Sequence, residues 1–140
     1  MNILSIYKQT DNKDFFMASY NDDEAYSLAY KGTYVDAINE AQCVWGLDID
    51  SVIVEIDAEI TFNYDSGLYG SHDGFFNAVV LIDGKAYHFQ CCTDETGKVD
   101  FDDCGYTDGQ CGDCNGELAE VVGWGGVHSL LERAYSEYNN

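Results

Sequence analysis

Apolar and polar residues alternate along much of this chain, and the period of the alternation predicts its strands and helices. The clearest strand runs from Val52 to Tyr64, where every second residue is apolar and the intervening residues from Glu55 onward are acidic or polar. One face of this strand is therefore expected to be buried and the other to face solvent. A strand of this length is also expected to contain a bend or a bulge.

Two hairpins are predicted from shorter apolar runs. The first joins Asn2–Lys8 to Phe15–Tyr20 through a polar turn. The second joins residues 75–82 to residues 85–92 through Asp83-Gly84, a dipeptide typical of type I′ turns. The first arm of the second hairpin is apolar on both faces, which predicts a central strand.

Helical periodicity marks two segments. From Tyr34 to Trp45 apolar residues recur on one stripe, with Thr33 as the expected N-cap and Gly46 as the expected end. A second stripe covers residues 127–138 and follows a glycine-rich break. A shorter third helix is expected after Asn21, whose side chain can cap it.

Together these elements predict an α+β fold: a mainly antiparallel sheet of about five strands, with two to three helices packed on one face. The length of 140 residues is that of one domain, so residues 1–140 are expected to fold as a single unit. A hydrophobic content of 46% favours a folded globule over a disordered chain.

Five of the six cysteines lie between Cys91 and Cys114, in a segment that is rich in glycine and aspartate. Such a segment has too few apolar side chains to close a core of its own. Zn²⁺ binds four ligands tetrahedrally and prefers thiolates. The sequence therefore predicts a structural zinc ion that staples the loop within residues 91–115.

The predicted ligands come from both ends of this segment. Cys111 and Cys114 form a C-x-x-C sequence that is expected to be a turn, with Gly112 giving the backbone freedom to fold around the metal. Two upstream cysteines complete the site. The predicted set is Cys92, Cys104, Cys111 and Cys114.

Cys92 is preferred to Cys91 because of strand alternation. Cys91 shares a face with the aromatic residues of its strand, whereas Cys92 points to the opposite face. His88 lies on the same face as Cys92 and is an alternative ligand. Two other interpretations stay open: disulfides between the cysteines, and buried thiols without a metal.

The charge of the chain restricts its partners. Twenty-six Asp and Glu residues against six Lys and Arg residues give a net charge of −20, spread over the whole sequence. Such a charge costs stability through self-repulsion and opposes binding to nucleic acid or to an anionic membrane. The expected partner is a basic protein surface. Because no signal peptide or membrane span is visible, the protein is expected to be cytoplasmic, with reduced thiols.

No arrangement of residues in the sequence indicates catalysis. A nucleophile elbow, an H-E-x-x-H sequence and a phosphate-binding glycine loop are all missing. Four cysteines indicate a closed structural zinc site, whereas a catalytic zinc keeps one position open. A binding protein without enzymatic activity is therefore expected, and the alternative is a small zinc-dependent hydrolase or a zinc-stabilised adaptor.

In length, acidity, lack of targeting signals and the zinc-type segment from Cys92 to Cys114, the sequence resembles the small phage-encoded anti-CRISPR proteins that inhibit Cas9. The resemblance implies an inhibitor that mimics DNA, occupies a nucleic-acid-binding surface of Cas9 and blocks loading of target DNA. It also implies that a structural zinc ion holds an acidic loop in shape.

The acids expected to contact this partner lie on the long strand and in the cysteine segment. Acids on one strand face are spaced about 6.6–6.8 Å apart, which is too sparse to imitate DNA without neighbouring acids. The predicted contacts are Glu55, Asp57, Glu59, Asp100, Asp102 and Asp103.

Overall fold

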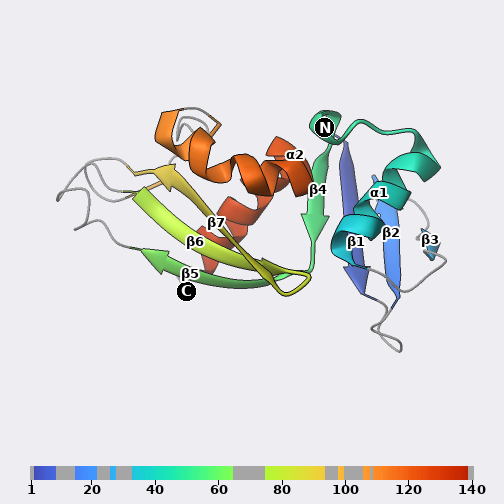
Figure 1. Ribbon diagram of the computed structural model, residues 1–140, viewed down its shortest axis with the longest axis horizontal. Helices are drawn as coiled ribbons and strands as arrows, with labels where there is room; N and C mark the ends of the chain where they lie inside the picture. Colours follow the sequence, from blue (N-terminus) through green and yellow to red (C-terminus); the bar gives the residue numbers. More distant parts are fainter. Residues whose placement is uncertain are drawn as a thin grey trace.

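The computed structural model describes residues 2–8, 15–21, 26–27, 33–64, 75–93, 98–99, 106–107 and 109–138. Within them, two α-helices, one short 3-10 helix and seven strands follow one another along the chain (Figure 1). They are β1 (Ile3–Lys8), β2 (Phe16–Tyr20), β3 (Tyr26–Ser27), α1 (Tyr34–Trp45), η1 (Ile49–Ser51), β4 (Ile53–Ile56), β5 (Glu59–Tyr64), β6 (Phe75–Ile82), β7 (Lys85–Cys92) and α2 (Gly109–Tyr138).

The α+β class is confirmed, but the strands form two sheets where one was expected. One sheet has the order β3-β2-β1-β4 and the other has the order β5-β6-β7. Every strand pair is antiparallel except β1 with β4, which are parallel. Both predicted hairpins are present, and β6 is the central strand of its sheet as its apolar sequence predicts.

The second sheet arises because the long strand predicted at Val52–Tyr64 breaks at Asp57 and Ala58. Before the break, β4 pairs with β1; after it, β5 pairs with β6. The predicted alternation nevertheless continues through the break. Val52, Val54, Ile56 and Ala58 are buried, while Glu55, Asp57 and Glu59 are exposed. The expected bend therefore serves to move the chain from one sheet to the other while its buried face stays in one core.

The α1 helix begins and ends as the sequence predicts. The Thr33 hydroxyl accepts a hydrogen bond of 3.1 Å from the backbone N–H of Asp36, and Gly46 ends the helix. The helix expected after Asn21 falls mostly outside the described residues. Tyr26 and Ser27, which lie within the expected helix, form the short strand β3 instead and pair with β2, so the helix prediction is wrong there.

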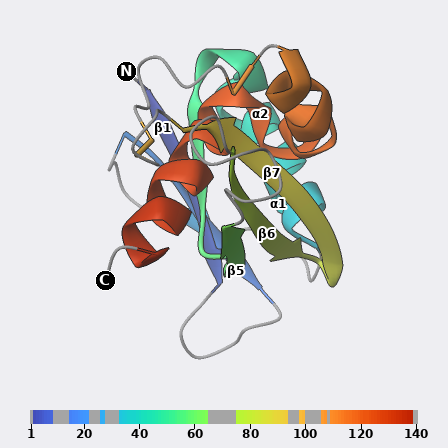
Figure 2. The same cartoon turned by 90° about the vertical axis from the view of Figure 1, so that its left-hand side faces the viewer.

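The α2 helix is longer than predicted because it begins at Gly109 and therefore includes the C-x-x-C sequence. The break predicted in the glycine-rich stretch is present at Gly123, where φ is 74° and ψ is 168°. A side chain at Gly123 would bring its Cβ to 2.6 Å from the carbonyl oxygen of Ile49, so only glycine fits. Figures 1 and 2 show that the two halves of α2 run in different directions on either side of this break.

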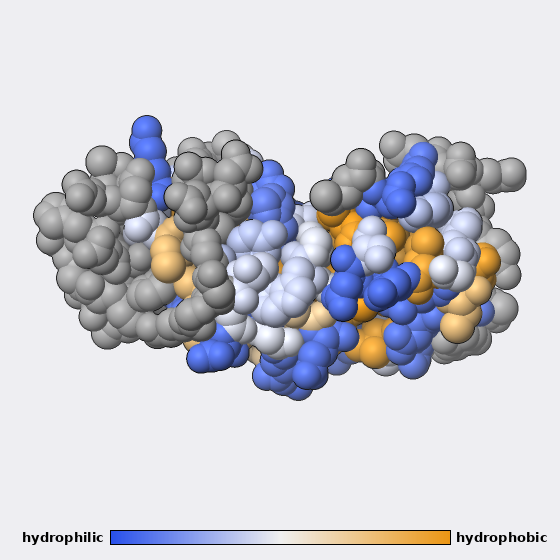
Figure 3. Space-filling model, turned by 90° about the horizontal axis from the view of Figure 1, so that it is seen from above, coloured by the Kyte–Doolittle hydropathy of each residue, from blue (hydrophilic) through white to orange (hydrophobic). Residues whose placement is uncertain are grey.

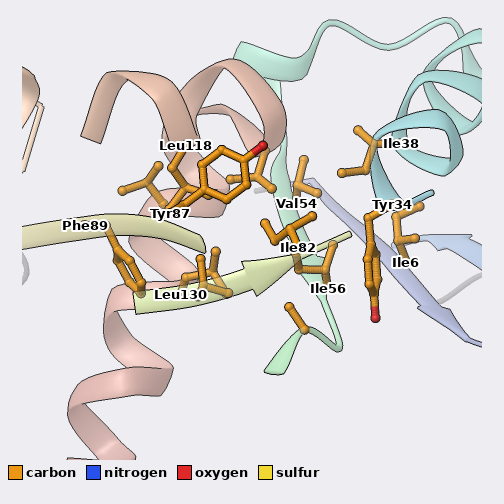
Figure 4. Packing of buried hydrophobic residues seen from close by; sticks show 14 of the residues in the cluster. Ile6, Tyr34, Ile38, Val54, Ile56, Ile82, Tyr87, Phe89, Leu118 and Leu130 are labelled. Atoms are coloured by element: carbon orange, nitrogen blue, oxygen red, sulfur yellow. The ribbon is translucent and has the colours of Figure 1, made fainter. Parts of the chain in front are cut away.

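One hydrophobic cluster spans both sheets and both helices. Figure 4 shows Ile82 of β6 lying between side chains of the first sheet and side chains of the second sheet with α2. The large side chains in this core that are under 2% exposed include Phe76, Phe89, Leu4, Ile6, Ile38, Ile82, Leu118, Leu131, Val54, Val80, Val122 and Val127.

The turn of the β6–β7 hairpin caps α1. Asp83 and Gly84 have φ values of 56° and 79°, as the predicted type I′ turn requires. The Asp83 carboxylate accepts hydrogen bonds from the backbone N–H groups of Tyr34, at 2.6 Å, and Val35, at 3.2 Å. Because the first N–H groups of a helix have no partner within the helix, this carboxylate both satisfies them and joins the two sheets.

The side chain of Tyr34 connects α1 to the break between β4 and β5. Its side chain is 5% exposed, and its hydroxyl donates a hydrogen bond to the Asp57 carboxylate. The other oxygen of Asp57 accepts from the backbone N–H of Lys8 at 3.1 Å. Burial, and then the bond to Asp57, raise the pKa of Tyr34. Stability from this group is therefore complete below the ordinary tyrosine pKa and is lost as the pH rises above it.

Replacing Asp83 by Gly should lower the free energy of unfolding by about 1–2 kcal/mol, because the N–H groups of Tyr34 and Val35 lose their acceptor while the turn keeps its left-handed backbone. The measurement is urea unfolding followed by circular dichroism. Asp83→Asn is the matched control, since it keeps an acceptor oxygen and tolerates positive φ, and it should lose less than half as much. A Gly variant as stable as the parent protein would contradict this role.

Candidate functional site

The cysteine segment brings two predicted zinc ligands together where β7 ends and α2 begins. The Sγ atom of Cys92, the last residue of β7, lies 3.5 Å from the Sγ atom of Cys111 in the first turn of α2. In Figure 1 the first half of α2 lies beside the end of β7. Two thiols that are 19 residues apart in the sequence are thus in contact.

A buried asparagine holds this junction in place. Asn115 is 0% exposed, its Oδ1 accepts from the backbone N–H of Gln90 at 2.7 Å, and its Nδ2 donates to the carbonyl oxygen of Gln90 at 2.7 Å. The same Nδ2 donates to the carbonyl oxygen of Tyr106 at 2.9 Å. The side-chain amide therefore pairs with Gln90 as a neighbouring strand would. It satisfies the backbone N–H and C=O of Gln90 on the edge of β7 that faces away from β6.

The thiols take their positions from this pairing. Cys111 lies about one helical turn before Asn115, and Cys114 is its immediate neighbour. The Nε2 atom of Gln90 donates to the Sγ atom of Cys114 at 3.4 Å. Gln90, which is 4% exposed, therefore contacts Asn115 through its backbone and Cys114 through its side chain.

Two predictions about the C-x-x-C sequence are wrong in structural detail. Cys111 and Cys114 lie in a helix and not in a turn. Gly112 does not provide a flexible turn; a Cβ atom there would lie 2.6 Å from the carbonyl oxygen of Thr107, so glycine permits a close approach of two backbones. The helix begins early because the 106–107 segment and β7 both pack against its first turns.

The other candidate ligands differ in their surroundings. Cys91 is 0% exposed and packs in the hydrophobic core, whereas Cys92 is exposed, as the strand alternation predicts. His88 is also exposed on the Cys92 side of β7. Cys104, the fourth predicted ligand, lies outside the described residues. The two cysteines therefore lie on opposite faces of β7, as expected, and the role of Cys92 as a ligand stays a prediction.

The distance between the two thiols fits shared metal ligation. Zn–S bonds of about 2.3 Å in a tetrahedral site place two sulfur atoms about 3.8 Å apart, whereas a disulfide bond is about 2.05 Å long. None of the five cysteines in the described ranges forms a disulfide. No group of three or more His, Cys, Asp or Glu side chains within those ranges has the arrangement of a metal site.

The predicted partner-binding acids divide into three groups. Glu55 and Glu59 are exposed on either side of the break between the sheets, whereas the carboxylate of Asp57 is also used within the chain by Tyr34 and Lys8. The remaining three lie outside the described residues: Asp100, Asp102 and Asp103.

A further row of acids on α2 was missed by the sequence analysis. Asp113, Glu117 and Glu120 are exposed and lie at positions i, i+4 and i+7 of the helix, on one face. Helical spacing could have revealed this row, but the C-x-x-C sequence within it was interpreted as a turn. Glu117 forms an ion pair with Lys85, and this hydrogen bond raises the pKa of Lys85.

Three basic side chains in the described residues lie beside an acid or an aromatic ring. Lys85 pairs with Glu117, and Arg133 lies 3.7 Å from Glu137 while it donates to the carbonyl oxygen of Ile56 at 3.2 Å. Lys8 lies over the ring of Tyr34. These contacts leave little positive charge to offset the acids elsewhere on the surface.

Comparison of the chain with protein-family models, with curated proteins and with solved structures finds no match. Within the described part of the chain, no helix is long and apolar enough to cross a membrane. The function is therefore inferred from the charge, the thiol junction and the surface.

Replacing Asn115 by Ala should lower the free energy of unfolding by about 3 kcal/mol, because it leaves the N–H and C=O of Gln90 buried without a partner. Chemical unfolding measures the loss. The control is Asn39→Ala at an exposed position of α1, where a change within about 0.5 kcal/mol is expected. Equal effects of the two substitutions would mean that the Asn115 pairing does not stabilise the fold.

Proposed function

We propose that this chain is an acidic inhibitor that binds a basic nucleic-acid-binding surface of a Cas9-type defence effector and blocks loading of target DNA. The observation that carries the proposal is the net charge of −20, combined with basic side chains that contact acids of the same chain. A surface with this balance attracts a positively charged groove and repels nucleic acid.

Two rows of carboxylates supply the proposed contact surface. The α2 row contains Asp113, Glu117 and Glu120; with a rise of about 1.5 Å per residue, these three acids fall within about 10.5 Å of helix axis. The strand row contains Glu55 and Glu59, which are further apart. Figure 3 shows pale residues of intermediate hydropathy over the middle of the molecule, with hydrophilic residues in blue along its upper and lower edges. The α2 row would add carboxylates to those of the strand row, which by itself is too sparse to resemble a nucleic acid.

Inhibition follows from occupancy of the groove. Long-range attraction steers the acidic protein onto the basic surface, and contact then excludes the DNA phosphates that need the same Lys and Arg side chains. No covalent step is required. For this inhibitor the site of action is the host bacterial cytoplasm, where a phage-encoded protein would meet its target.

A structural zinc ion is part of the proposal. Cys92, Cys104, Cys111 and Cys114 would hold it, and the zinc would join the end of β7 to the start of α2 and to the cysteine loop. Support comes from the Cys92–Cys111 contact and from the Gln90 side chain, since N–H donors to sulfur commonly stabilise metal-bound thiolates. Four protein ligands leave no open position for catalysis.

Replacing Cys111 by Ser should remove stoichiometric zinc and lower the Tm by about 10 °C, because a structural zinc ion contributes several kcal/mol to folding. The measurements are metal content by mass spectrometry and thermal unfolding, both in reducing buffer. Cys43→Ser, at an exposed cysteine of α1, is the matched control and should keep zinc and Tm unchanged. Parent protein that neither retains nor takes up zinc would contradict the metal site.

Inhibition of target-DNA binding by guide-loaded Cas9 should weaken about tenfold or more when salt rises from roughly 50 to 200 mM, because charge contacts are screened. A DNA-binding titration at both salt concentrations measures the effect. Asp113→Asn and Glu120→Gln should each weaken inhibition at low salt, whereas Asp36→Asn, the same charge change on α1, should not. Unchanged DNA binding at saturating protein would contradict the proposed function.

A further inference from the structure

A cavity of about 330 Å³ lies between η1, β4 and the second half of α2. Tyr106 closes one side of it. The residues that matter here are Asp50, Val52, Ile53, Tyr106, Gly125 and His128. They come from segments that are up to 78 residues apart in the sequence, so the cavity exists only in the folded chain.

The floor of the cavity is apolar and preformed. Val52 is 4% exposed, and a Cβ atom at Gly125 would lie 2.6 Å from the carbonyl oxygen of Val52. Helix α2 therefore lies directly against β4 at this point, and Ile53 completes the floor beside it. A floor built from two such closely packed elements needs no rearrangement to accept a ligand.

The wall of the cavity is aromatic. The rings of Tyr106 and His128 pack edge to face, with centroids 5.2 Å apart. The Nε2 atom of His128 lies 2.9 Å from the Glu132 carboxylate, and the carbonyl oxygen of Tyr106 accepts from Asn115. The pairing with Glu132 orients the His128 ring, and the bond from Asn115 holds the backbone of Tyr106.

The mouth of the cavity carries a carboxylate. Asp50 is exposed in η1, and its backbone N–H donates to the Asp48 side chain at 3.1 Å. Asp48 is therefore the N-cap of η1. Among the described residues no hydrogen bond or ion pair engages the Asp50 carboxylate, so it can serve a ligand at the cavity.

We propose that this cavity binds an arginine side chain of the basic partner. The methylene stem of arginine would lie on Val52 and Ile53, and the planar guanidinium group would stack on Tyr106 and form a hydrogen-bonded ion pair with Asp50. The volume is near the lower end of ligand pockets, which suits one side chain. Lysine fits less well because its compact ammonium group is more strongly hydrated and does not stack. The identity of the partner rests on the proposed function, but the binding of arginine does not.

The test is titration of the intact zinc-supplemented protein with N-acetyl-arginine amide, followed by two-dimensional NMR. Shift changes should centre on Ile53, Gly125 and His128. The neutral isostere N-acetyl-citrulline amide should bind about tenfold more weakly, because it cannot pair with a carboxylate. Asp50→Asn and Tyr106→Leu should each weaken arginine binding severalfold, and Asp36→Asn, an equal charge change on α1, should leave it unchanged.

Three results would overturn the proposal. Equal binding of arginine and citrulline would remove the role of Asp50, and equal losses for Asp50→Asn and Asp36→Asn would mean general charge attraction. Preferential binding of adenosine, a neutral flat probe, would assign the cavity to a different ligand. Arginine binding in a protein that leaves Cas9 activity unchanged would refute the proposed target and retain the arginine site.

Discussion

The break between β4 and β5 at Asp57 and Ala58 is the constraint on which the rest of the fold depends. It lets one continuous run of alternating residues belong to two sheets while its apolar side chains stay in one core. Two carboxylates hold the sheets together around it: Asp57 accepts from Tyr34, and Asp83 accepts from the first N–H groups of α1. Because the same tyrosine takes part in both connections, α1, the β4–β5 break and the β6–β7 hairpin are positioned together.

The thiol junction depends on this core through a second buried connection. Leu118 and Phe89 place α2 and β7 on the same cluster, and Asn115 then aligns the two elements by hydrogen bonds to Gln90. The contact between Cys92 and Cys111 follows from that alignment. The thiol pair is therefore a consequence of packing, and a zinc ion would reinforce an arrangement that the hydrophobic core and one asparagine already favour.

Acidic side chains have two different roles in this chain. Asp57, Asp83 and Asp48 accept hydrogen bonds from other groups of the chain, so their charges contribute to the fold. Exposed acids such as Asp113 and Glu120 have no comparable structural role, and their mutual repulsion costs stability. A basic partner would relieve this repulsion, which explains in physical terms why an excess of acid favours a binding function.

The sequence by itself determined the local elements of this protein. Thr33 and Gly46 bound α1, Asp83-Gly84 shapes the hairpin, and strand alternation separates Cys91 from Cys92, because caps, turns and side-chain faces depend on residues only a few positions apart. Only the tertiary structure decided that the strands form two sheets, that the C-x-x-C sequence is helical, that Cys92 meets Cys111, and that Tyr106 and Asp50 line one cavity. These features depend on packing between residues far apart in the chain, for which the sequence has no periodic signal.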